Sequence, residues 1–300
     1  MTSVAPATFL DPAMLARISD LALLARTVVE GFMHGMHRSP RKGFSIDFAQ
    51  HRQYQLGDDL RRIDWKAFAR TDKFYIKEYE ADTNAGVVFA LDASGSMNFG
   101  SGSVTKFDYG RFLTASLAWL SQHQGDRVGL ITFTDGLAEV IPPSTRHLQL
   151  MLHTLGHSHA SGAGQLKTSL DRIAHITPRA GIIVLVTDCY EDPELIGRAI
   201  AVLRARRHDV IVFHLIDPAE RDLPGRDAAI FEDLESGTRI PLRPGELRTK
   251  YRGLVDAHRA ALADRMTNAG ADYVPVETDK PLDAALYAYL DARLAKSRVR

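Results

Sequence analysis

Short apolar runs alternate with amphipathic stretches along most of this chain. Four runs are almost continuously apolar, at residues 86–91, 128–133, 182–186 and 210–216. Stretches with apolar residues at helical spacing lie between and after them, at residues 105–123, 166–176, 193–207, 246–269 and 282–295. Apolar runs between amphipathic helices are typical of buried parallel strands. The pattern therefore predicts an α/β fold, with a mostly parallel sheet and helices on both of its faces.

Weaker signals add elements at both edges of this pattern. Val140, which follows an Asp135-Gly136 turn, indicates a short edge strand, and residues 272–276 indicate a last strand. Two β-like stretches flank Glu235-Ser236-Gly237, which predicts a hairpin inserted at about residues 217–245.

The N-terminal part of the chain has its own pattern. Asp11 and Pro12 are a good helix start, and apolar residues then recur at helical spacing to about Met36. Residues 74–79 are typical of a strand. We expect an N-terminal unit over residues 1–84 and an α/β domain over residues 85–300. We also expect the N-terminal segment and the inserted hairpin to pack together as a small β-containing subdomain.

Composition narrows the class of protein. The 300 residues include 37 Lys and Arg against 37 Asp and Glu, and the zero net charge argues against a dedicated polyanion binder. Cys189 is the single cysteine, so no disulfide can form within the chain, which fits a reducing compartment. The sequence has no apolar run of about 18 residues and no signal-peptide pattern at its start. We expect a cytoplasmic protein without a membrane span.

Oxygen-bearing side chains follow two of the predicted strands. The first apolar run leads directly into Asp92, Ser94 and Ser96, and the run at residues 182–186 leads into Asp188. Gly95 permits the tight turn that brings both hydroxyls to one side. Carboxylate and hydroxyl oxygens suit a hard divalent cation such as Mg²⁺. The alternative is that the two aspartates simply cap the helices that follow them.

The motif Asp92-Ala93-Ser94-Gly95-Ser96-Met97 resembles the metal-ion-dependent adhesion site of von Willebrand factor A domains. This resemblance implies a doubly wound sheet with one antiparallel edge strand, and a site made by Asp92, Ser94, Ser96, a threonine and Asp188. In this chain Gly164 or Gln165 stands where the threonine is expected, and Thr168 comes three or four residues late. We therefore expect a partial site for Mg²⁺.

A basic and aromatic segment precedes the first long apolar run. Residues 37–77 contain ten Lys and Arg against five acids. Residues 52–71, the signature segment, are similar to the signature of Domain of Unknown Function family 58, bacterial proteins that carry a von Willebrand factor A-like domain. The matching positions are Tyr54, Gly57, Asp58, Asp59, Arg61, Asp64, Trp65 and Arg70.

Three roles are open for the signature segment. Ion pairs and the indole of Trp65 can lock it onto the domain, or it can contact a protein partner. Interleaved basic and aromatic residues also suit nucleic acid, but Asp58, Asp59 and Asp64 interrupt the basic patch, so we expect no nucleic-acid binding.

Other chemistry-bearing residues give weaker signals. His153, His157 and His159 have a spacing that transition metals use. The glutamate of the usual zinc-protease motif is missing, so a polar helix end is the favoured interpretation. Cys189 and the two site serines lack the surroundings of a nucleophile, and the chain contains neither of the common phosphate-binding loops.

The sequence therefore favours a non-enzymatic module that binds other proteins. A cation on Asp92, Ser94 and Ser96 would leave an open coordination position for an acidic side chain of a partner. The family resemblance implies a MoxR-type AAA+ ATPase as that partner, in the assembly or maturation of other proteins. The alternatives are a Mg²⁺-dependent hydrolase that uses Asp92 and Asp188, and a structural domain with a degenerate metal site.

Overall fold

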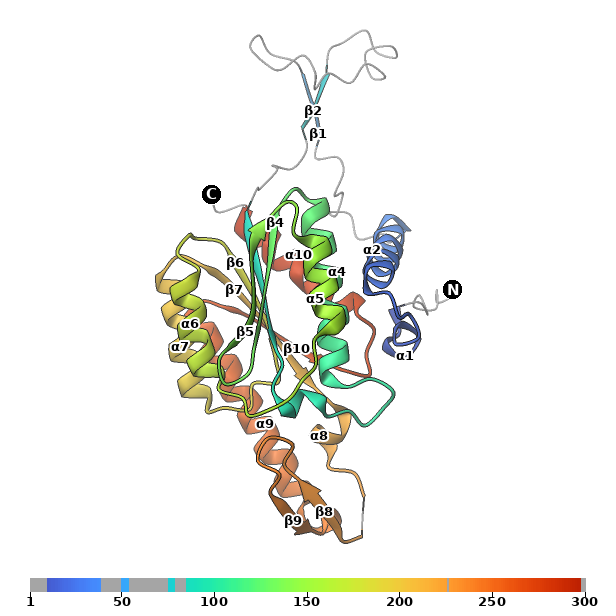
Figure 1. The fold of residues 1–300 in the computed structure, drawn as a ribbon, viewed down its shortest axis with the longest axis vertical. Helices are drawn as coiled ribbons and strands as arrows, with labels where there is room; N and C mark the ends of the chain where they lie inside the picture. Colours follow the sequence, from blue (N-terminus) through green and yellow to red (C-terminus); the bar gives the residue numbers. More distant parts are fainter. Residues whose placement is uncertain (1–9, 39–49, 54–74, 79–84, 226, 298–300) are drawn as a thin grey trace.

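A six-stranded sheet forms the centre of the protein, in a computed structural model that describes residues 10–38, 50–53, 75–78, 85–225 and 227–297 (Figure 1). Its strand order is β10-β7-β6-β3-β4-β5, and only β5 runs antiparallel to its neighbour. The bounds are β3 (Gly86–Asp92), β4 (Arg127–Phe133), β5 (Leu137–Ser144), β6 (Ile182–Thr187), β7 (Asp209–Ile216) and β10 (Asp272–Glu277). The doubly wound α/β fold with one antiparallel edge strand is confirmed.

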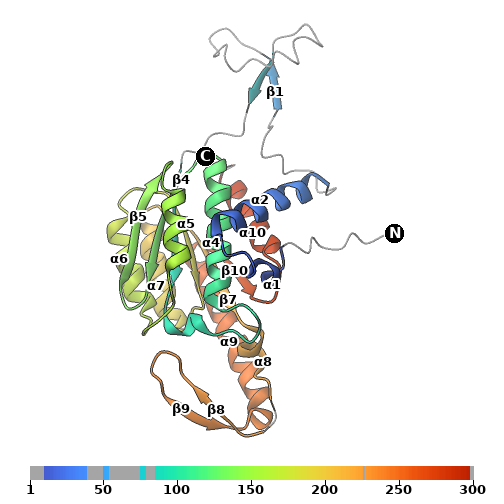
Figure 2. The same ribbon diagram turned by 45° about the vertical axis from the view of Figure 1, so that its right-hand side comes forward.

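Helices cover both faces of this sheet (Figures 1 and 2). One face carries α2 (Leu21–Arg38), α4 (Lys106–His123), α5 (Leu148–His157) and α10 (Asp283–Ser297). The other face carries α6 (Leu166–Ile176), α7 (Pro193–Ala205) and α9 (Pro244–Ala269). Two of the helices that follow central strands begin at a side-chain signal readable in the sequence. Thr105 and Asp108 form a capping box on α4, and Asp192 caps α7 with Pro193 in its first turn.

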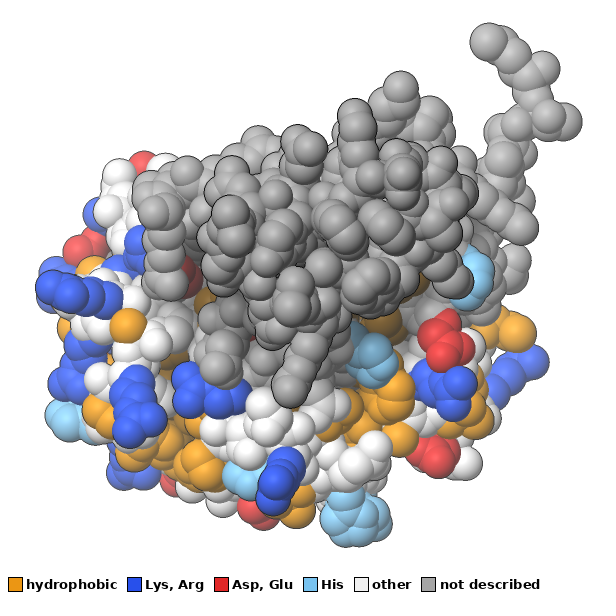
Figure 3. All heavy atoms as spheres, turned by 90° about the horizontal axis from the view of Figure 1, so that it is seen from above, with side chains coloured by type: hydrophobic (Ala, Val, Ile, Leu, Met, Phe, Trp, Pro, Cys, Tyr) orange, Lys and Arg blue, Asp and Glu red, His pale blue; other side chains and the backbone are white. Residues whose placement is uncertain are grey.

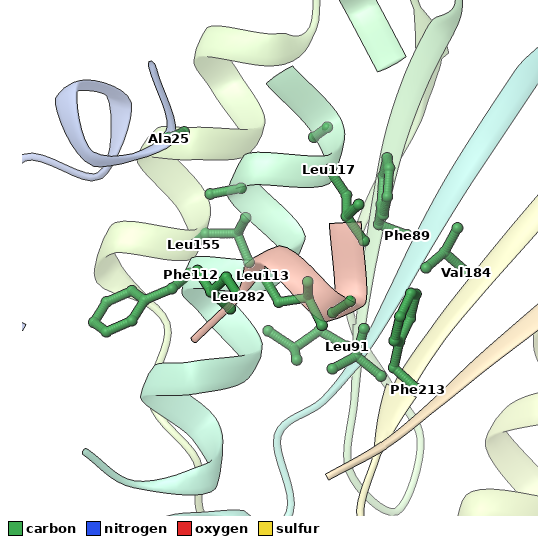
Figure 4. Close-up of a cluster of buried hydrophobic side chains, with 14 of the residues drawn as sticks. Ala25, Phe89, Leu91, Phe112, Leu113, Leu117, Leu155, Val184, Phe213 and Leu282 are labelled. Atoms are coloured by element: carbon green, nitrogen blue, oxygen red, sulfur yellow. The ribbon is translucent and has the colours of Figure 1, made fainter. Parts of the chain in front are cut away.

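The central strand β3 divides its side chains between two hydrophobic clusters. Phe89 and Leu91 point toward α4 and share the first cluster with Phe213 (Figure 4). Val88 and Ala90 lie in the second cluster, beneath α6 and α7. Successive strand residues face opposite sides of a sheet, so burial on both sides requires the continuous apolar run that the sequence shows.

The N-terminal helix is broken where the apolar spacing predicted a continuous one. The structure has α1 (Pro12–Leu15) and then α2, separated by residues 16–20. Asp20 accepts hydrogen bonds from the backbone N–H groups of Ala22 and Leu23, so it starts a second helix. The apolar positions of α2 then pack in the same cluster as α4 and α5. The boundary at residue 85 stays a prediction.

The two β-hairpins do not pack together, so that part of the prediction is wrong. The strands β1 (Gln50–Gln53) and β2 (Tyr75–Glu78) pair only with each other, as do β8 (Ala229–Glu232) and β9 (Arg239–Leu242). They lie at opposite ends of the molecule (Figures 1 and 2). Each pair completes its hydrogen bonds locally, and the inserted hairpin docks elsewhere through its tip. In the chain, β8 and β9 come between β7 and β10.

The signature segment lies outside the described residues, apart from Arg52 and Gln53 at the end of β1, so its roles stay predictions. Around the undescribed atoms in Figure 3, Lys and Arg side chains are mixed with acidic and hydrophobic ones on the described part of that face. No helix in the described part of the chain is long and apolar enough to cross a membrane.

Candidate functional site

The carboxyl ends of β3 and β6 lie next to each other at the switch point of the sheet. From β3 the chain continues to β4 on one side, and it later returns to β6 on the other side. Ligands of open α/β sheets bind at this position. Asp92 ends β3 and Asp188 follows β6, and each residue is only 4% exposed. The structure thus brings together two acids that are distant in the sequence.

Asp92 is held by the backbone and by two hydroxyl side chains. Its Oδ1 accepts a hydrogen bond from the N–H of Ser94 at 2.9 Å, and its Oδ2 accepts one from Thr187 Oγ1 at 2.6 Å. Burial, followed by the charge of Asp188, raises the pKa of Asp92 to about 7, although hydrogen bonds from Thr187 and Ser94 act against the rise. The charged carboxylate therefore carries an energetic penalty that a nearby cation would relieve.

The hydroxyls of Ser94 and Ser96 meet beside Asp92. The two Oγ atoms lie 3.1 Å apart, and Ser94 is almost fully buried. The 3₁₀ helix Gly95–Asn98 carries Ser96 back toward Ser94. Three oxygen-bearing side chains of the predicted set thus occupy one corner of the site.

A second loop, residues 161–165, packs on the serine loop. The N–H of Gly95 donates to the carbonyl of Gly162, and the N–H of Ser161 donates to the carbonyl of Ala93, both at 2.8 Å. A β-carbon on Gly95 would stand 2.7 Å from the carbonyl oxygen of Leu234 and 2.9 Å from that of Gly162. Only glycine allows this close approach, which is a stronger requirement than the tight turn alone.

The threonine that the resemblance led us to expect has no direct replacement in this loop. Thr168 donates its hydroxyl to the side-chain oxygen of Gln165 at 3.1 Å, so these two side chains pair with each other. Gly164 faces Ser94 instead, because a β-carbon on Gly164 would lie 3.4 Å from Ser94 Oγ. Its N–H donates to Glu235 Oε2 at 2.9 Å.

Asp188 is paired with a buried lysine. Lys106, the first residue of α4, has no exposed side-chain surface, and its Nζ lies 2.8 Å from Asp188 Oδ2 and 2.6 Å from Glu220 Oε1. Burial lowers the pKa of Lys106, but Asp188 and Glu220 raise it more, so the net shift is upward. Lys106 is therefore charged, and its single positive charge compensates for one of the two carboxylates that it contacts, Asp188 and Glu220.

Short α8 (Pro218–Asp222) places Glu220 beside Lys106. Asp217, at the end of β7, is buried and caps this helix by accepting from the N–H of Ala219 at 2.8 Å. Its other carboxylate oxygen accepts from the N–H of Ser101 at 2.9 Å. The segment between β7 and the inserted hairpin is thus built into the site.

Sequence reasoning missed four side chains of this site. Thr187 could have been found from the sequence, because it directly precedes Asp188 at the end of β6, where a hydroxyl can donate a hydrogen bond to a neighbouring carboxylate. Lys106, Glu220 and Glu235 carry no such signal, because each contacts its partner across a long stretch of chain. Lys106 is 82 residues and Glu220 is 32 residues from Asp188, and Glu235 is 71 residues from Gly164.

The donor set fits a small hard cation. Asp92 offers a carboxylate whose negative charge is destabilised by burial, and Ser94 and Ser96 offer adjacent hydroxyls. Asp188 has one oxygen engaged by Lys106. The described residues include no group of three or more His, Cys, Asp and Glu that would hold a metal on their own. A cation at this edge would therefore depend on the serine oxygens.

The other candidates lie apart from this arrangement. His153 and His157 are exposed and tilted against each other on α5, with ring centroids 4.3 Å apart. Cys189 is fully buried, and burial raises the pKa of its thiol well above the usual value. The thiol is therefore protonated and shielded, which is unfavourable for a nucleophile.

A cavity of about 230 Å³ borders the site on the side of β7 and α9. Its walls include Asp188, Tyr190, Tyr251, Leu254 and Arg259. The Tyr190 ring lies over Lys106, with Nζ 4.6 Å from the ring centroid. The cavity places apolar and aromatic surface next to Asp188.

Known proteins similar to this chain include uncharacterised mycobacterial ones. The uncharacterized protein Rv1480 of Mycobacterium tuberculosis (strain ATCC 25618 / H37Rv) is 27% identical over 290 residues, which cover 94% of this chain and 90% of that protein. The uncharacterized protein MAV169 of Mycobacterium avium is 28% identical over 131 residues, or 43% of this chain and 76% of that protein.

Two solved structures are similar to the chain in shape. The conserved hypothetical protein BatB from Bacteroides thetaiotaomicron gives a TM-score of 0.49 at 17% identity, covering 71% of this chain and 98% of that one. The SpRpn10 VWA domain gives 0.42 at 13% identity, covering 68% and 94%. The family model described as "Protein of unknown function DUF58" matches residues 50–261. This match spans more than half of the sequence, and the chain therefore belongs to the DUF58 family.

Proposed function

We propose that this protein is a non-catalytic interaction module that binds a protein partner at the carboxyl edge of its sheet. The observation that carries the proposal is the convergence of Asp92, Ser94 and Ser96 at the switch point, with the two hydroxyl oxygens 3.1 Å apart. A divalent cation such as Mg²⁺ held there by three side chains keeps coordination positions open. An acidic side chain of the partner fills one of them.

The surroundings of the site support a protein partner. Tyr190 is 56% exposed and Leu254 is 62% exposed, and both line the cavity beside Asp188. Exposed aromatic and aliphatic side chains next to a polar anchor are typical of interaction surfaces. By family resemblance, we propose a MoxR-type AAA+ ATPase as the partner, in assembly or maturation of other proteins. We also propose a cytoplasmic location, in line with the single buried Cys189.

A co-purification experiment tests this function. The tagged full-length chain is mixed with the MoxR-type ATPase of the same organism, with Mg²⁺ or with EDTA. We expect capture of the ATPase with Mg²⁺, and loss of capture in EDTA and in Asp92→Asn. The control variant Asp171→Asn changes an exposed acid on α6 that pairs with Lys167, and it should bind normally.

Two results would contradict the proposal. Capture that is indifferent to both Mg²⁺ and Asp92→Asn would remove the cation from the interaction. Turnover of phosphate esters with Mg²⁺, abolished by Asp92→Asn, would show that the protein is a hydrolase.

A further inference from the structure

The tip of the β8–β9 hairpin contacts both loops of the candidate site. Glu235 Oε2 accepts a hydrogen bond from the N–H of Gly164 at 2.9 Å. The carbonyl oxygen of Leu234 lies 2.7 Å from the point where a β-carbon on Gly95 would stand. An acid from a distant insertion is thereby placed against the serine loop.

Glu235 borders the place where a threonine oxygen would extend from Gly164. A β-carbon on Gly164 would lie 3.2 Å from Glu235 Oε1 and 3.4 Å from Ser94 Oγ. A hydroxyl attached to that carbon would therefore compete with the Glu235 carboxylate for the same space. The chain has glycine at this position and an acid from elsewhere beside it.

The other oxygens near this position are already engaged. Thr168 donates to Gln165, and Asp188 Oδ2 accepts from Lys106. Glu235 is half-buried, and among the described residues its carboxylate has one recorded hydrogen bond, the one from Gly164. Its Oε1 therefore has acceptor capacity left for a cation.

We propose that Glu235 is an oxygen ligand of the cation, together with Asp92, Ser94 and Ser96. The proposal rests on the proposed function and names a residue of the same site. A carboxylate brings a full negative charge, so it compensates for the absent hydroxyl with a stronger ligand for Mg²⁺. One coordination position is then filled within the chain, and another stays open for the partner.

This ligand would couple the cation to the hairpin. The hairpin strands are largely exposed, with Ile230 at 71% and Ile240 at 52% exposure. Few contacts other than those of its tip hold it to the domain. A cation bound by Glu235 would fix the tip, so the hairpin would become part of the partner-binding face when the site is loaded.

Calorimetric titration of the full chain with Mg²⁺ and with Mn²⁺ tests the assignment. Glu235→Gln keeps an acceptor for the Gly164 N–H but removes the charge, and it should weaken binding by about tenfold or more. Glu232→Gln changes an exposed acid on the same hairpin that pairs with Arg239, and its affinity should equal that of the wild type. Amide exchange of residues 233–238 should slow with Mg²⁺ in the wild type and not in Glu235→Gln.

The outcomes separate this inference from the proposed function. If Glu235→Gln binds the cation as tightly as the wild type while Asp92→Asn does not bind it, Glu235 is only a hydrogen-bond acceptor and the inference is wrong. The proposed function then stands. If the wild type binds neither ion, the cation-dependent function fails and the inference fails with it.

Discussion

Replacement of Lys106 by methionine tests the buried charge cluster most directly. Methionine has a similar length and keeps most of the packing, so the change mainly removes the ammonium. Asp188 and Glu220, at 5% and 17% side-chain exposure, are then left as buried acids without their cation. Removing one partner of a buried ion pair typically costs about 3–5 kcal/mol. We expect a loss in this range in the free energy of unfolding near pH 8.

The loss should depend on pH in a defined direction. Burial already raises the pKa of Glu220 in the wild type, and Lys106 is the main group that opposes this rise. Without the ammonium of Lys106 that opposition is lost, so protonation of Glu220 relieves the variant and the loss shrinks toward pH 5. In the wild type, the pKa of Lys106 is raised by Asp188 and Glu220 against the effect of burial. The stabilisation from its ammonium is therefore complete below the unfolded pKa of 10.5 and disappears only as pH rises through the higher folded value.

Urea unfolding followed by circular dichroism in EDTA measures both effects. Lys167→Met is the matched control, because Lys167 pairs with Asp171 on an exposed helix surface and should cost less than about 0.5 kcal/mol. The double variant Lys106→Met/Glu220→Gln should recover part of the loss. A loss below about 1 kcal/mol, or one equal near pH 5 and pH 8, would refute the assigned role of Lys106.

Three further predictions concern the same edge of the sheet. Burial and Asp188 raise the pKa of Asp92 to about 7, so its carboxylate is charged near pH 8 at a cost to the folded state. Asp92→Asn removes this charge, and in EDTA near pH 8 it should melt at a higher temperature than the wild type and gain no stability from Mg²⁺. A lower melting temperature would contradict this. Burial lowers the pKa of His214 to about 3, so the folded state favours its neutral imidazole. The stabilisation of the fold by this neutral form is complete above pH 6.5 and is lost as pH falls toward 3. In urea titrations, His214→Gln should therefore show a weaker dependence of the free energy of unfolding on pH over this range. Gly95→Ala should cost about 1–3 kcal/mol and open residues 233–238 to limited proteolysis, since its methyl group meets two backbone carbonyls; unchanged cleavage would refute the docking of the tip.

The fold could be read from the sequence because its signals are local. Each central strand is an apolar run buried on both faces, and most helices start at a side-chain cap such as Thr105 or Asp192. The break before α2 was missed although Asp20 carries the same kind of signal, because the apolar spacing on either side stays in phase. The position of the inserted hairpin depends on contacts of its tip, which no local pattern reports.

The site could be predicted only where the topology determines it. Asp92 and Asp188 end neighbouring parallel strands, so any sheet of this order brings them together. Lys106 and Glu235 reach the same edge through side-chain contacts across 82 and 71 residues. Such contacts depend on packing rather than on spacing, and for that reason the sequence predicted a partial site and not the residues around it.

The ion pairs of Lys106 hold the acidic edge of the sheet together without a metal ion. Lys106 stabilises Asp188 and Glu220 without a metal, and the core beneath Asp92 is closed by apolar side chains. Removal of the cation should therefore lower stability only by the binding linkage, about 2.7 kcal/mol when the free ion is at 100 times its dissociation constant. Under the proposed function, we expect the domain without its cation to stay folded, and the cation to control partner binding at the Asp92 corner. A protein built in this way can gain or lose a partner with the ion while its sheet remains unchanged.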